Sequence, residues 1–290
     1  MILNKLAVRR RDEPVAVTIK DASEGFVWLN DPKWYLWDGG FLVHGRCEGV
    51  ISPHQQHSIQ IVIALDGCTS ISDSRGEWHS GRGIIIAHDV EHAHKGENAH
   101  RAAILVDPES FEGLWLRSSL KSDVTIVPES RLQKCIEELR TFIERPFESM
   151  EVRALIRHCV HSLCPGAPPT KRLDPRVTLV LQAIRASDDL RISLEDAASK
   201  ACLSPGRFAH LFKEQVGLPF RRYMLWRKLT RAAIAIGREG TIAAAAQAGD
   251  FSDAAHLART FSAMFGPPPS AMKRGEYFEI DSPWSSGPER

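Results

Sequence analysis

Residues 192–217 read ISLEDAASKACLSPGRFAHLFKEQVG, and residues 241–266 read TIAAAAQAGDFSDAAHLARTFSAMFG. Each stretch contains a short Ala-rich segment, a turn, and a second segment that ends at a glycine. Their first apolar anchors, Ile192 and Ile242, lie 50 residues apart. One supersecondary unit is therefore expected twice in this part of the chain.

Helix signals bound both segments of the first copy. Ser193 precedes two acidic residues, a pattern typical of an N-cap followed by the positive first turn of a helix. Ser204-Pro205 predicts the start of the second helix, because proline is favoured at the first helical position. Gly217 predicts its end. The first copy therefore reads as two helices joined by a tight turn.

The second helix of each copy is expected to bury one face and expose the other. The apolar stripes at helical spacing are Phe208, Leu211 and Phe212 in the first copy and Leu257, Phe261 and Phe265 in the second. The small, polar and basic opposite faces fit the major groove of DNA: Ser204, Gly206, Arg207, Ala209, His210 and Lys213 in the first copy, and Ser252, Ala255, His256 and Arg259 in the second. Ser252 is the expected cap of its helix. Arg259, surrounded by alanines, can reach guanine O6 and N7.

A continuous helix is predicted between the copies, over residues 219–236. At 1.5 Å per residue it spans roughly 27 Å, which would place the outer helices about one DNA turn, roughly 34 Å, apart. A single pattern of this kind is more often an ordinary helical hairpin. Two copies at this spacing favour a pair of DNA-reading units.

The charge of the chain is divided unevenly along its length. Residues 171–274 contain 17 Lys and Arg against 9 Asp and Glu, a net charge of +8, whereas the remainder contains 20 against 27, a net charge of −7. The whole-chain charge of +1 conceals this difference. Phosphate binding requires such a basic surface, which favours DNA as the partner of the carboxyl-terminal part.

Residues 174–274 resemble the DNA-binding domain of AraC/XylS-type transcription regulators. The resemblance rests on these residues: Ser193 to Ala198, Leu203 to Pro205, Leu211 to Lys213, Gly217 to Pro219, Tyr223, Arg227, Leu229, Ile242, Phe251 to Asp253, His256, Arg259, Phe261, Phe265, Gly266, Pro269 and Ser270. It implies sequence-specific binding to double-stranded promoter DNA by two helix-turn-helix units, with RNA polymerase as a further partner. Asp250 stands where the family usually has glycine, and Asp tolerates the left-handed conformation better than most residues. Gly206 and Ala209 predict a more shape-dependent readout by the first unit.

The predicted architecture is an α+β chain of two domains. We expect a ligand-binding and dimerisation domain over residues 1–164, a Pro- and Gly-containing linker over 165–173 and the DNA-binding domain over 174–274. A loosely ordered tail is expected over 275–290, with Tyr277, Phe278 and Trp284 as the side chains that could dock on the rest of the protein. The chain has no run of 18 apolar residues and no signal-peptide pattern, so we expect a cytoplasmic protein without a membrane partner. Six cysteines without CxxC spacing predict reduced thiols.

The amino-terminal domain reads as an antiparallel β-barrel or sandwich. Strand-like runs occur at residues 15–19, 35–43, 58–65, 83–87 and 102–106. The spacing of Gly49, His54, His57 and Gly67, and then of Gly83, His94 and Asn98, resembles the two motifs of cupin barrels. Many AraC-type regulators use such a barrel to bind an effector, so the resemblance implies a small-molecule partner.

Two interpretations of the barrel histidines stay open. His54, His57 and His94 could hold a divalent metal, because neutral imidazoles are common metal ligands. No glutamate follows His57 at the position that the first cupin motif expects, which favours structural or pocket-lining histidines and no cofactor. The candidate effector pocket comprises Trp34, Trp37, His57 and His94.

A helical hairpin is predicted after the barrel, first with Leu132, Ile136, Leu139 and Ile143 at helical spacing and then over residues 149–163. The resemblance implies that this region forms a homodimer. The leading functional hypothesis is a transcription regulator, not an enzyme, whose barrel binds an effector. The rival hypothesis is a metal-dependent cupin enzyme with an auxiliary helical domain, and a third is DNA binding without an effector.

Overall fold

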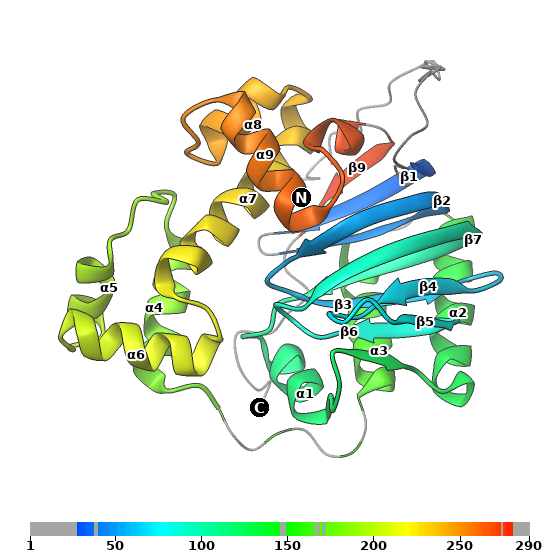
Figure 1. Cartoon of the computed structure of the whole chain (residues 1–290), viewed down its shortest axis with the longest axis horizontal. Helices are drawn as coiled ribbons and strands as arrows, with labels where there is room; N and C mark the ends of the chain where they lie inside the picture. Colours follow the sequence, from blue (N-terminus) through cyan, green and yellow to red (C-terminus); the bar gives the residue numbers. More distant parts are fainter. Residues whose placement is uncertain are drawn as a thin grey trace, which may run out of the picture.

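The computed structural model describes residues 28–37, 40–145, 149–164, 166, 169, 172–273 and 275–280. The strand expected at residues 15–19 and the tail residue Trp284 lie outside these ranges. A large sheet has helices on both faces, and the helices between residues 175 and 216 form a lobe that projects to one side (Figure 1). The predicted α+β architecture of two domains is confirmed.

The described strands form one mixed sheet. They are β1 (Trp28–Trp37), β2 (Gly40–Gln55), β3 (Ile59–Ala64), β4 (Thr69–Ser72), β5 (Trp78–Gly81), β6 (Gly83–Ile86), β7 (Glu91–Val106), β8 (Val124–Ile126) and β9 (Glu276–Glu279). Their order is β8-β6-β3-β7-β2-β1-β9, with β4 paired to both β5 and β7. β9 pairs with β1 in parallel, whereas the other pairings are antiparallel. The path of these strands is therefore open between β8 and β9, and the expected closed antiparallel barrel is not formed.

The run expected as one strand over residues 35–43 is divided between β1 and β2. Trp37 pairs with Gly40, so the chain reverses direction between these two residues. The sequence Asp38-Gly39 at this point is a strong hairpin signal, which the apolar run around it obscured.

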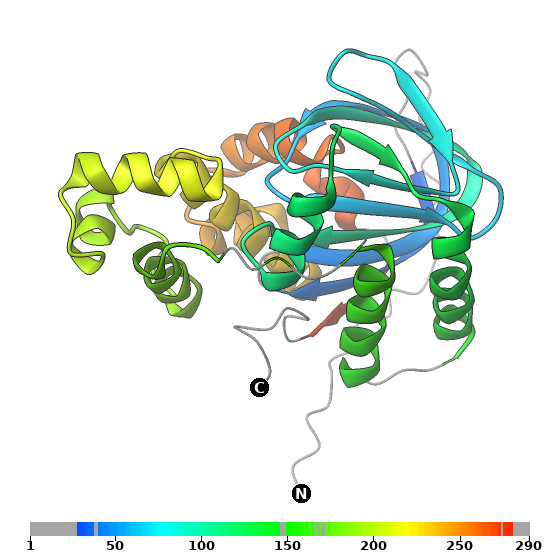
Figure 2. The same ribbon diagram turned by 90° about the horizontal axis from the view of Figure 1, so that it is seen from below.

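The described helices are α1 (Phe111–Ser119), α2 (Glu129–Glu144), α3 (Ser149–Leu163), α4 (Pro175–Ala186), α5 (Leu194–Lys200), α6 (Pro205–Val216), α7 (Phe220–Glu239), α8 (Ile242–Ala248) and α9 (Ala254–Phe265), followed by the 3-10 helix η1 (Pro269–Lys273). The predicted hairpin α2–α3 lies against the sheet, with its two helices side by side (Figure 2). The predicted repeat corresponds to α5–α6 and α8–α9, with α7 as the long helix between them.

Alternating residues of the central strands feed two cores, one on each face of the sheet. Tyr35 and Ile61 pack with α2 and α3 in the first core, whereas Trp34 and Val62 pack with α7 to α9 in the second. Successive side chains of a strand point to opposite faces, so β3 is buried along its whole length. A third core joins α4, α5, α6 and the start of α7, which explains why this lobe stands apart from the sheet (Figure 2).

The segment expected as a loose tail begins with a strand. Residues 276–279 pair with residues 33–36 of β1. The ring of Tyr277 stacks on Trp34 at a centroid distance of 6.3 Å, and Phe278 stacks on Tyr35 at 5.0 Å. The chain therefore returns from the carboxyl-terminal domain to complete the sheet of the amino-terminal domain.

Candidate functional site

The residues predicted to face DNA lie on the open surfaces of α6 and α9. Ala209 is half-buried, and the other nine are exposed: Ser204, Gly206, Arg207, His210, Lys213, Ser252, Ala255, His256 and Arg259. The opposite stripes are buried, with Phe208 and Phe212 in the lobe core and Leu257, Phe261 and Phe265 in the core against the sheet. The helices thus have the amphipathic division that the sequence predicted.

The caps of these helices follow the sequence with one correction. Ser193 and Asp196 form a capping box at the start of α5. Ser204 occupies the N-cap of α6 without a side-chain hydrogen bond. The N-cap of α9 is Asp253 rather than Ser252: the Asp253 carboxylate accepts a hydrogen bond from the backbone N–H of His256 at 2.7 Å. A carboxylate at this position also interacts with the positive end of the helix dipole.

The two turns between the paired helices have the same backbone geometry. Cys202 and Asp250 both have φ 53°, in the left-handed region. The N–H of Cys202 donates to the carbonyl of Ser199, and the N–H of Asp250 donates to that of Gln247. The side chain of Asp250 also accepts a hydrogen bond from Lys228 Nζ at 2.7 Å. Asp250 therefore supports the left-handed turn that its position requires.

A concave surface with a cavity volume of about 1130 Å³ lies between the two helix pairs and along α7. Of the residues predicted to face DNA, Ala209, His210, Lys213 and His256 line it. The others lie outside this lining, on α6 and α9 or just before these helices. The further charged residues that line the surface are Arg191, Arg221, Arg222, Lys228 and Asp250. The sequence contains no signal for the first four as binding residues, and Arg221, Arg222 and Lys228 lie among the buried residues of α7. A concavity with several cations and one carboxylate suits a polyanion.

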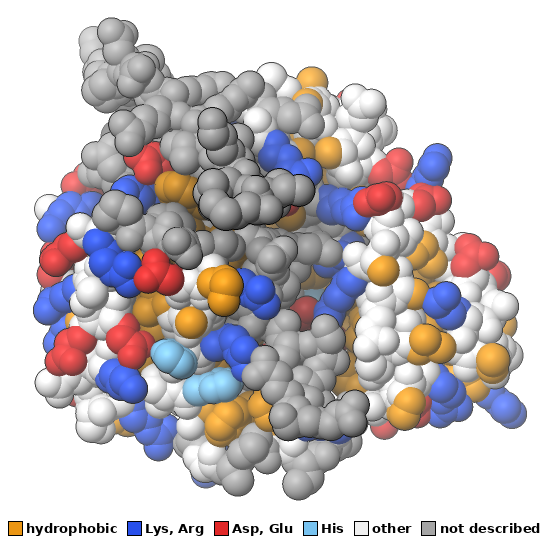
Figure 3. Space-filling model, turned by 180° about the vertical axis from the view of Figure 1, so that it is seen from behind, with side chains coloured by type: hydrophobic (Ala, Val, Ile, Leu, Met, Phe, Trp, Pro, Cys, Tyr) orange, Lys and Arg blue, Asp and Glu red, His pale blue; other side chains and the backbone are white. Residues whose placement is uncertain are grey.

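Positively and negatively charged side chains both occur on the face of the molecule that lies behind the view of Figure 1. There, Lys and Arg side chains are interspersed with Asp and Glu over the sheet domain and over the projecting lobe (Figure 3). Such mixing is typical of a solvated protein surface.

A second cavity, of about 90 Å³, lies between the sheet and the end of the carboxyl-terminal domain. Its apolar walls include Trp34 and Phe41 from the sheet and Phe261, Phe265 and Met272 from α9 and η1. Its polar lining consists of His54, Gln56, Gln60, His94 and Arg101. The cavity therefore touches both domains at once.

The structure places the predicted pocket residues in different environments. Trp34 and His94 line the cavity. Trp37 packs in the core on the other face of the sheet, because it lies an odd number of positions from Trp34 on the same strand. His57 lies outside the lining, so the expected set of four is only half assembled here.

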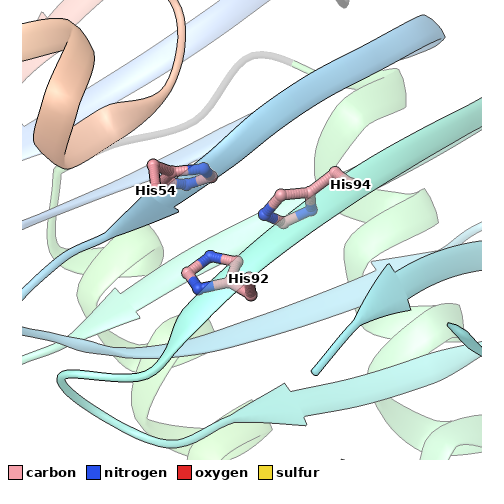
Figure 4. A group of neighbouring side chains, drawn as sticks. All are labelled: His54, His92 and His94. Carbon is pink, nitrogen blue, oxygen red and sulfur yellow. The ribbon is translucent and has the colours of Figure 1, made fainter. Parts of the chain in front are cut away.

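Three buried histidines meet beside this cavity: His54 on β2, and His92 and His94 on β7 (Figure 4). One nitrogen of each lies within 4.8 Å of one nitrogen of each other histidine. The sequence predicted His54, His57 and His94 as possible metal ligands, but the third histidine of the cluster is His92 rather than His57. The signal that could have found it is the spacing of two between His92 and His94, which puts both side chains on one face of a strand.

The protonation states of these histidines follow from their burial. Burial lowers the pKa of His54 to about 3 and that of His92 to about 4, with repulsion between the two rings contributing for His54. The pKa of His94 is lowered well below its ordinary value by burial and then by the charge of Arg101. All three are therefore neutral imidazoles at physiological pH.

His57 belongs to a charged network between the domains. Its Nδ1 lies 2.8 Å from Asp89 Oδ2, and its Nε2 lies 3.1 Å from Glu109 Oε1. Burial opposes its charge, but these two carboxylates raise the pKa of His57 to about 10. Nearby, Arg185 of α4 pairs with Asp107 at the end of β7. The network thus links the sheet domain to the projecting lobe.

Among known protein families, one matches the carboxyl-terminal part of the chain. Residues 197–275 match the family described as Helix-turn-helix domain, which is of the AraC type. No curated protein sequence matches the chain. No helix in the described part of the chain is long and apolar enough to cross a membrane.

Solved structures of ToxT share the fold over most of the chain. ToxT from Vibrio cholerae O395 is 11% identical, with 83% of this chain and 96% of that chain covered and a TM-score of 0.53. ToxT from V. cholerae strain SCE256, solved with an unsaturated fatty acid bound, is 11% identical, with 88% and 96% covered and a TM-score of 0.51. At this identity the likeness concerns the fold. The match of residues 197–275 identifies the carboxyl-terminal part of the chain as an AraC-type helix-turn-helix domain.

Proposed function

We propose that this protein is a sequence-specific transcription regulator whose DNA binding is controlled by a small molecule held between its two domains. The observation that carries the proposal is the concave surface between the helix pairs, which is lined by Lys213, Arg221, Arg222 and other Lys and Arg side chains. Residues 197–275 also match an AraC-type helix-turn-helix domain. Both features fit promoter DNA as the partner.

In this proposal α5–α6 and α8–α9 are two helix-turn-helix units. Their similar turns and their exposed second helices support this assignment. The 20 residues of α7 between them correspond to roughly 30 Å of helix. This length suits the reading of successive major grooves, which recur about every 34 Å on one face of DNA.

The proposed effector is a carboxylic acid with an apolar body. Arg101 is 6% exposed, and its Nη1 has no hydrogen-bond partner. A buried guanidinium group with an unpaired donor favours an anionic ligand, and a carboxylate matches its geometry. The aromatic walls of the same cavity suit an apolar chain. ToxT, which shares the fold, has been solved with an unsaturated fatty acid bound.

The size of the cavity suggests how such an effector would act. Its 90 Å³ is smaller than the roughly 300–1,000 Å³ of pockets that hold drug-sized ligands. A long acid would therefore require α9 and η1 to move away from the sheet. Since α9 is also the reading helix of the second unit, binding would change how this unit is presented to DNA.

The two remaining proposed partners are a second copy of the chain and RNA polymerase. A homodimer through the α2–α3 hairpin would place two DNA-binding domains on one promoter. Light scattering at micromolar concentration, with and without DNA, tests it; monomer in both conditions would contradict the dimer.

The rival proposal, a metal-dependent enzyme, draws its support from the three neighbouring histidines. It leaves the cationic concavity without a role, whereas the regulator uses both features. We therefore favour the regulator.

Selection of bound sequences from a random pool of DNA duplexes by the full-length protein tests the DNA-binding proposal. Enrichment of two short motifs about one helical turn apart is expected. Equal binding to all duplexes and to heparin would contradict it.

The effector is tested separately by thermal unfolding with straight-chain carboxylic acids and alcohols of matched length. Acids should raise the Tm of the parent protein, alcohols should not, and Arg101→Gln should abolish the shift. An equal shift from acids and alcohols would exclude the role of Arg101.

A further inference from the structure

We propose that His54, His92 and His94 bind one first-row transition metal ion, such as Zn²⁺ or Co²⁺, through three imidazole nitrogens. This site differs from the set His54, His57 and His94 that the motif spacing suggested, because it takes two ligands from alternate positions of β7. Its metal binding stands independently of the proposed function, and its regulatory consequence rests on that function.

The three side chains converge from two paired strands. His54 pairs with His92 in the register between β2 and β7, and the centroids of these two rings lie 4.3 Å apart. His94 lies two positions further along β7, with its ring 5.6 Å from His54 and 5.1 Å from His92. One nitrogen of each lies within 4.8 Å of the others. Tetrahedral coordination at about 2.0–2.1 Å requires nitrogens about 3.4 Å apart, so modest ring rotations complete the site.

Hydrogen bonds orient two of the rings as metal ligands. Nδ1 of His54 donates to the carbonyl of Ser52, and Nδ1 of His92 donates to the carbonyl of Val90, each at 2.9 Å. In a neutral imidazole, a proton on Nδ1 leaves the lone pair on Nε2, the arrangement common to metal-binding histidines. The side-chain oxygen Oε1 of Gln60 lies 3.1 Å from His92 Nε2. Because an amide oxygen only accepts hydrogen bonds, this side chain would have to turn away for Nε2 to present its lone pair to the ion.

His94 supplies the strongest indication of a missing ligand. It is 1% exposed, and neither of its ring nitrogens has a hydrogen-bond partner. A buried polar group without a partner destabilises the folded protein, so native structures rarely retain one. A metal ion would satisfy one nitrogen of His94 together with those of the other two histidines.

The surroundings define the remaining coordination position. His54 and His94 also line the cavity that contains Arg101. The positive charge of Arg101 opposes a divalent cation unless an anion lies between them. We therefore expect the fourth ligand to be an anion on the cavity side, which makes the carboxylate of the proposed effector a natural occupant.

The site also contacts the carboxyl-terminal domain. A Cβ added to Gly266, just after α9, would lie 2.9 Å from His54 Nδ1. Rotation of His54 toward a metal would thus change its contact with Gly266 at the end of α9. Metal occupancy would in this way influence the position of the second DNA-binding unit.

Other candidate clusters lack these properties. In the group of His57, His88 and Asp89, both nitrogens of His57 already contact carboxylates. In the group of Asp73, Glu77 and His79, Asp73 already accepts hydrogen bonds from backbone N–H groups and from His79, and Glu77 is exposed. Neither group contains a buried nitrogen that lacks a partner.

Metal content and Co²⁺ absorption of the full-length protein test the proposal. The apoprotein, prepared with a chelator, is titrated with Co²⁺ and with Zn²⁺, and the bound metal is measured by mass spectrometry. The variants are His54→Gln, His92→Gln and His94→Gln. His100→Gln is the matched control, because His100 lies on the same strand and contacts His44 instead of the cluster.

We expect the parent and His100→Gln to bind one equivalent of Co²⁺ with the visible bands of tetrahedral coordination. Each cluster variant should lose more than the roughly 10–100-fold in affinity that removal of an outer partner costs. Absence of binding in the parent, or equal binding by the cluster variants, would overturn the site. Circular dichroism identifies a variant that fails to fold, and the other two then decide the outcome. DNA selection on the metal-free protein tests the proposed function independently.

Discussion

Cys202 and Asp250 lie 48 residues apart and share the same left-handed backbone conformation, each with φ 53°. Each is followed by an apolar residue whose N–H donates to a carbonyl of the preceding helix, Leu203 to Ala198 and Phe251 to Ala246. The two turns therefore impose the same path on the chain between the paired helices. Non-glycine residues in this conformation carry a conformational cost.

Replacing Cys202 by glycine should therefore stabilise the protein. The left-handed conformation costs a non-glycine residue roughly 1–2 kcal/mol, and the greater freedom of glycine in the unfolded chain offsets part of the gain. We expect the free energy of unfolding to rise by roughly 0.5–1 kcal/mol in urea denaturation. Cys202→Val, with a β-branched side chain, should lower it. A glycine variant less stable than the parent would show that the turn differs from the one described.

The cap of α9 can be tested with two neighbouring substitutions. Asp253→Ala removes the acceptor of the His256 N–H and should lower the free energy of unfolding by about 1 kcal/mol. Ser252→Ala is the matched control, since its hydroxyl bonds to the Asp253 side chain and does not cap the helix. Equal losses in the two variants would contradict the assignment of Asp253.

Arg259→Ala should weaken binding to the selected DNA site by about 1–3 kcal/mol and relax the preference at one base pair. Arg259 is exposed on α9, so the substitution should leave folding intact. Fluorescence anisotropy with specific and random duplexes measures the change. If the ratio of the two affinities stays at the parent value, Arg259 contacts phosphate rather than a base.

Lys228→Ala makes a useful comparison for Arg259. Lys228 lines the concavity and pairs with Asp250. Loss of a phosphate contact should weaken specific and random duplexes alike and should reduce the salt dependence of binding by about one ion. A changed base preference in this variant would contradict the assignment to phosphate.

The network around His57 predicts lower stability at high pH. The folded-state pKa of about 10 exceeds the ordinary value of 6.5, so the contribution of this group is fully present below pH 6.5 and is lost as the pH rises through 10. Unfolding measured between pH 6 and 11 should show a smaller decline in His57→Gln than in the parent. Parallel curves would mean that His57 is not protonated between the two carboxylates.

Asp89 should act in the opposite direction at low pH. Burial opposes its charge, but hydrogen bonds from His57 and His88 lower the pKa of Asp89 to about 2. Its contribution is present above pH 3.8 and is lost as the pH falls toward 2. Asp89→Asn should therefore flatten the stability profile between these values, as measured by urea denaturation.

The carboxyl-terminal domain was the more predictable half because its signals are local. Caps, glycines and the spacing of Phe208, Phe212, Phe261 and Phe265 depend on residues a few positions apart, and the structure places all four side chains in cores. The exposed faces of α6 and α9 followed directly. The N-cap of α9 differed because serine and aspartate are adjacent and both are good caps.

The amino-terminal domain was less predictable because strand pairing is non-local. The cluster of His54, His92 and His94 depends on the register between β2 and β7, which the sequence does not state. Likewise, the interdomain cavity combines Arg101 with Phe265, two residues far apart along the chain. Motif spacing therefore predicted two of the three clustered histidines, His54 and His94. It did not predict the cavity between the two domains.

The parallel pairing of β9 with β1 makes the amino-terminal sheet depend on the last part of the chain. During synthesis, the edge of β1 stays uncovered until residues 276–279 have been made. Proteolytic cleavage between α3 and α4 would likewise leave the two fragments joined through this pairing. The two domains thus follow one another along most of the chain but share one sheet, whose edge at β1 is covered by residues 276–279.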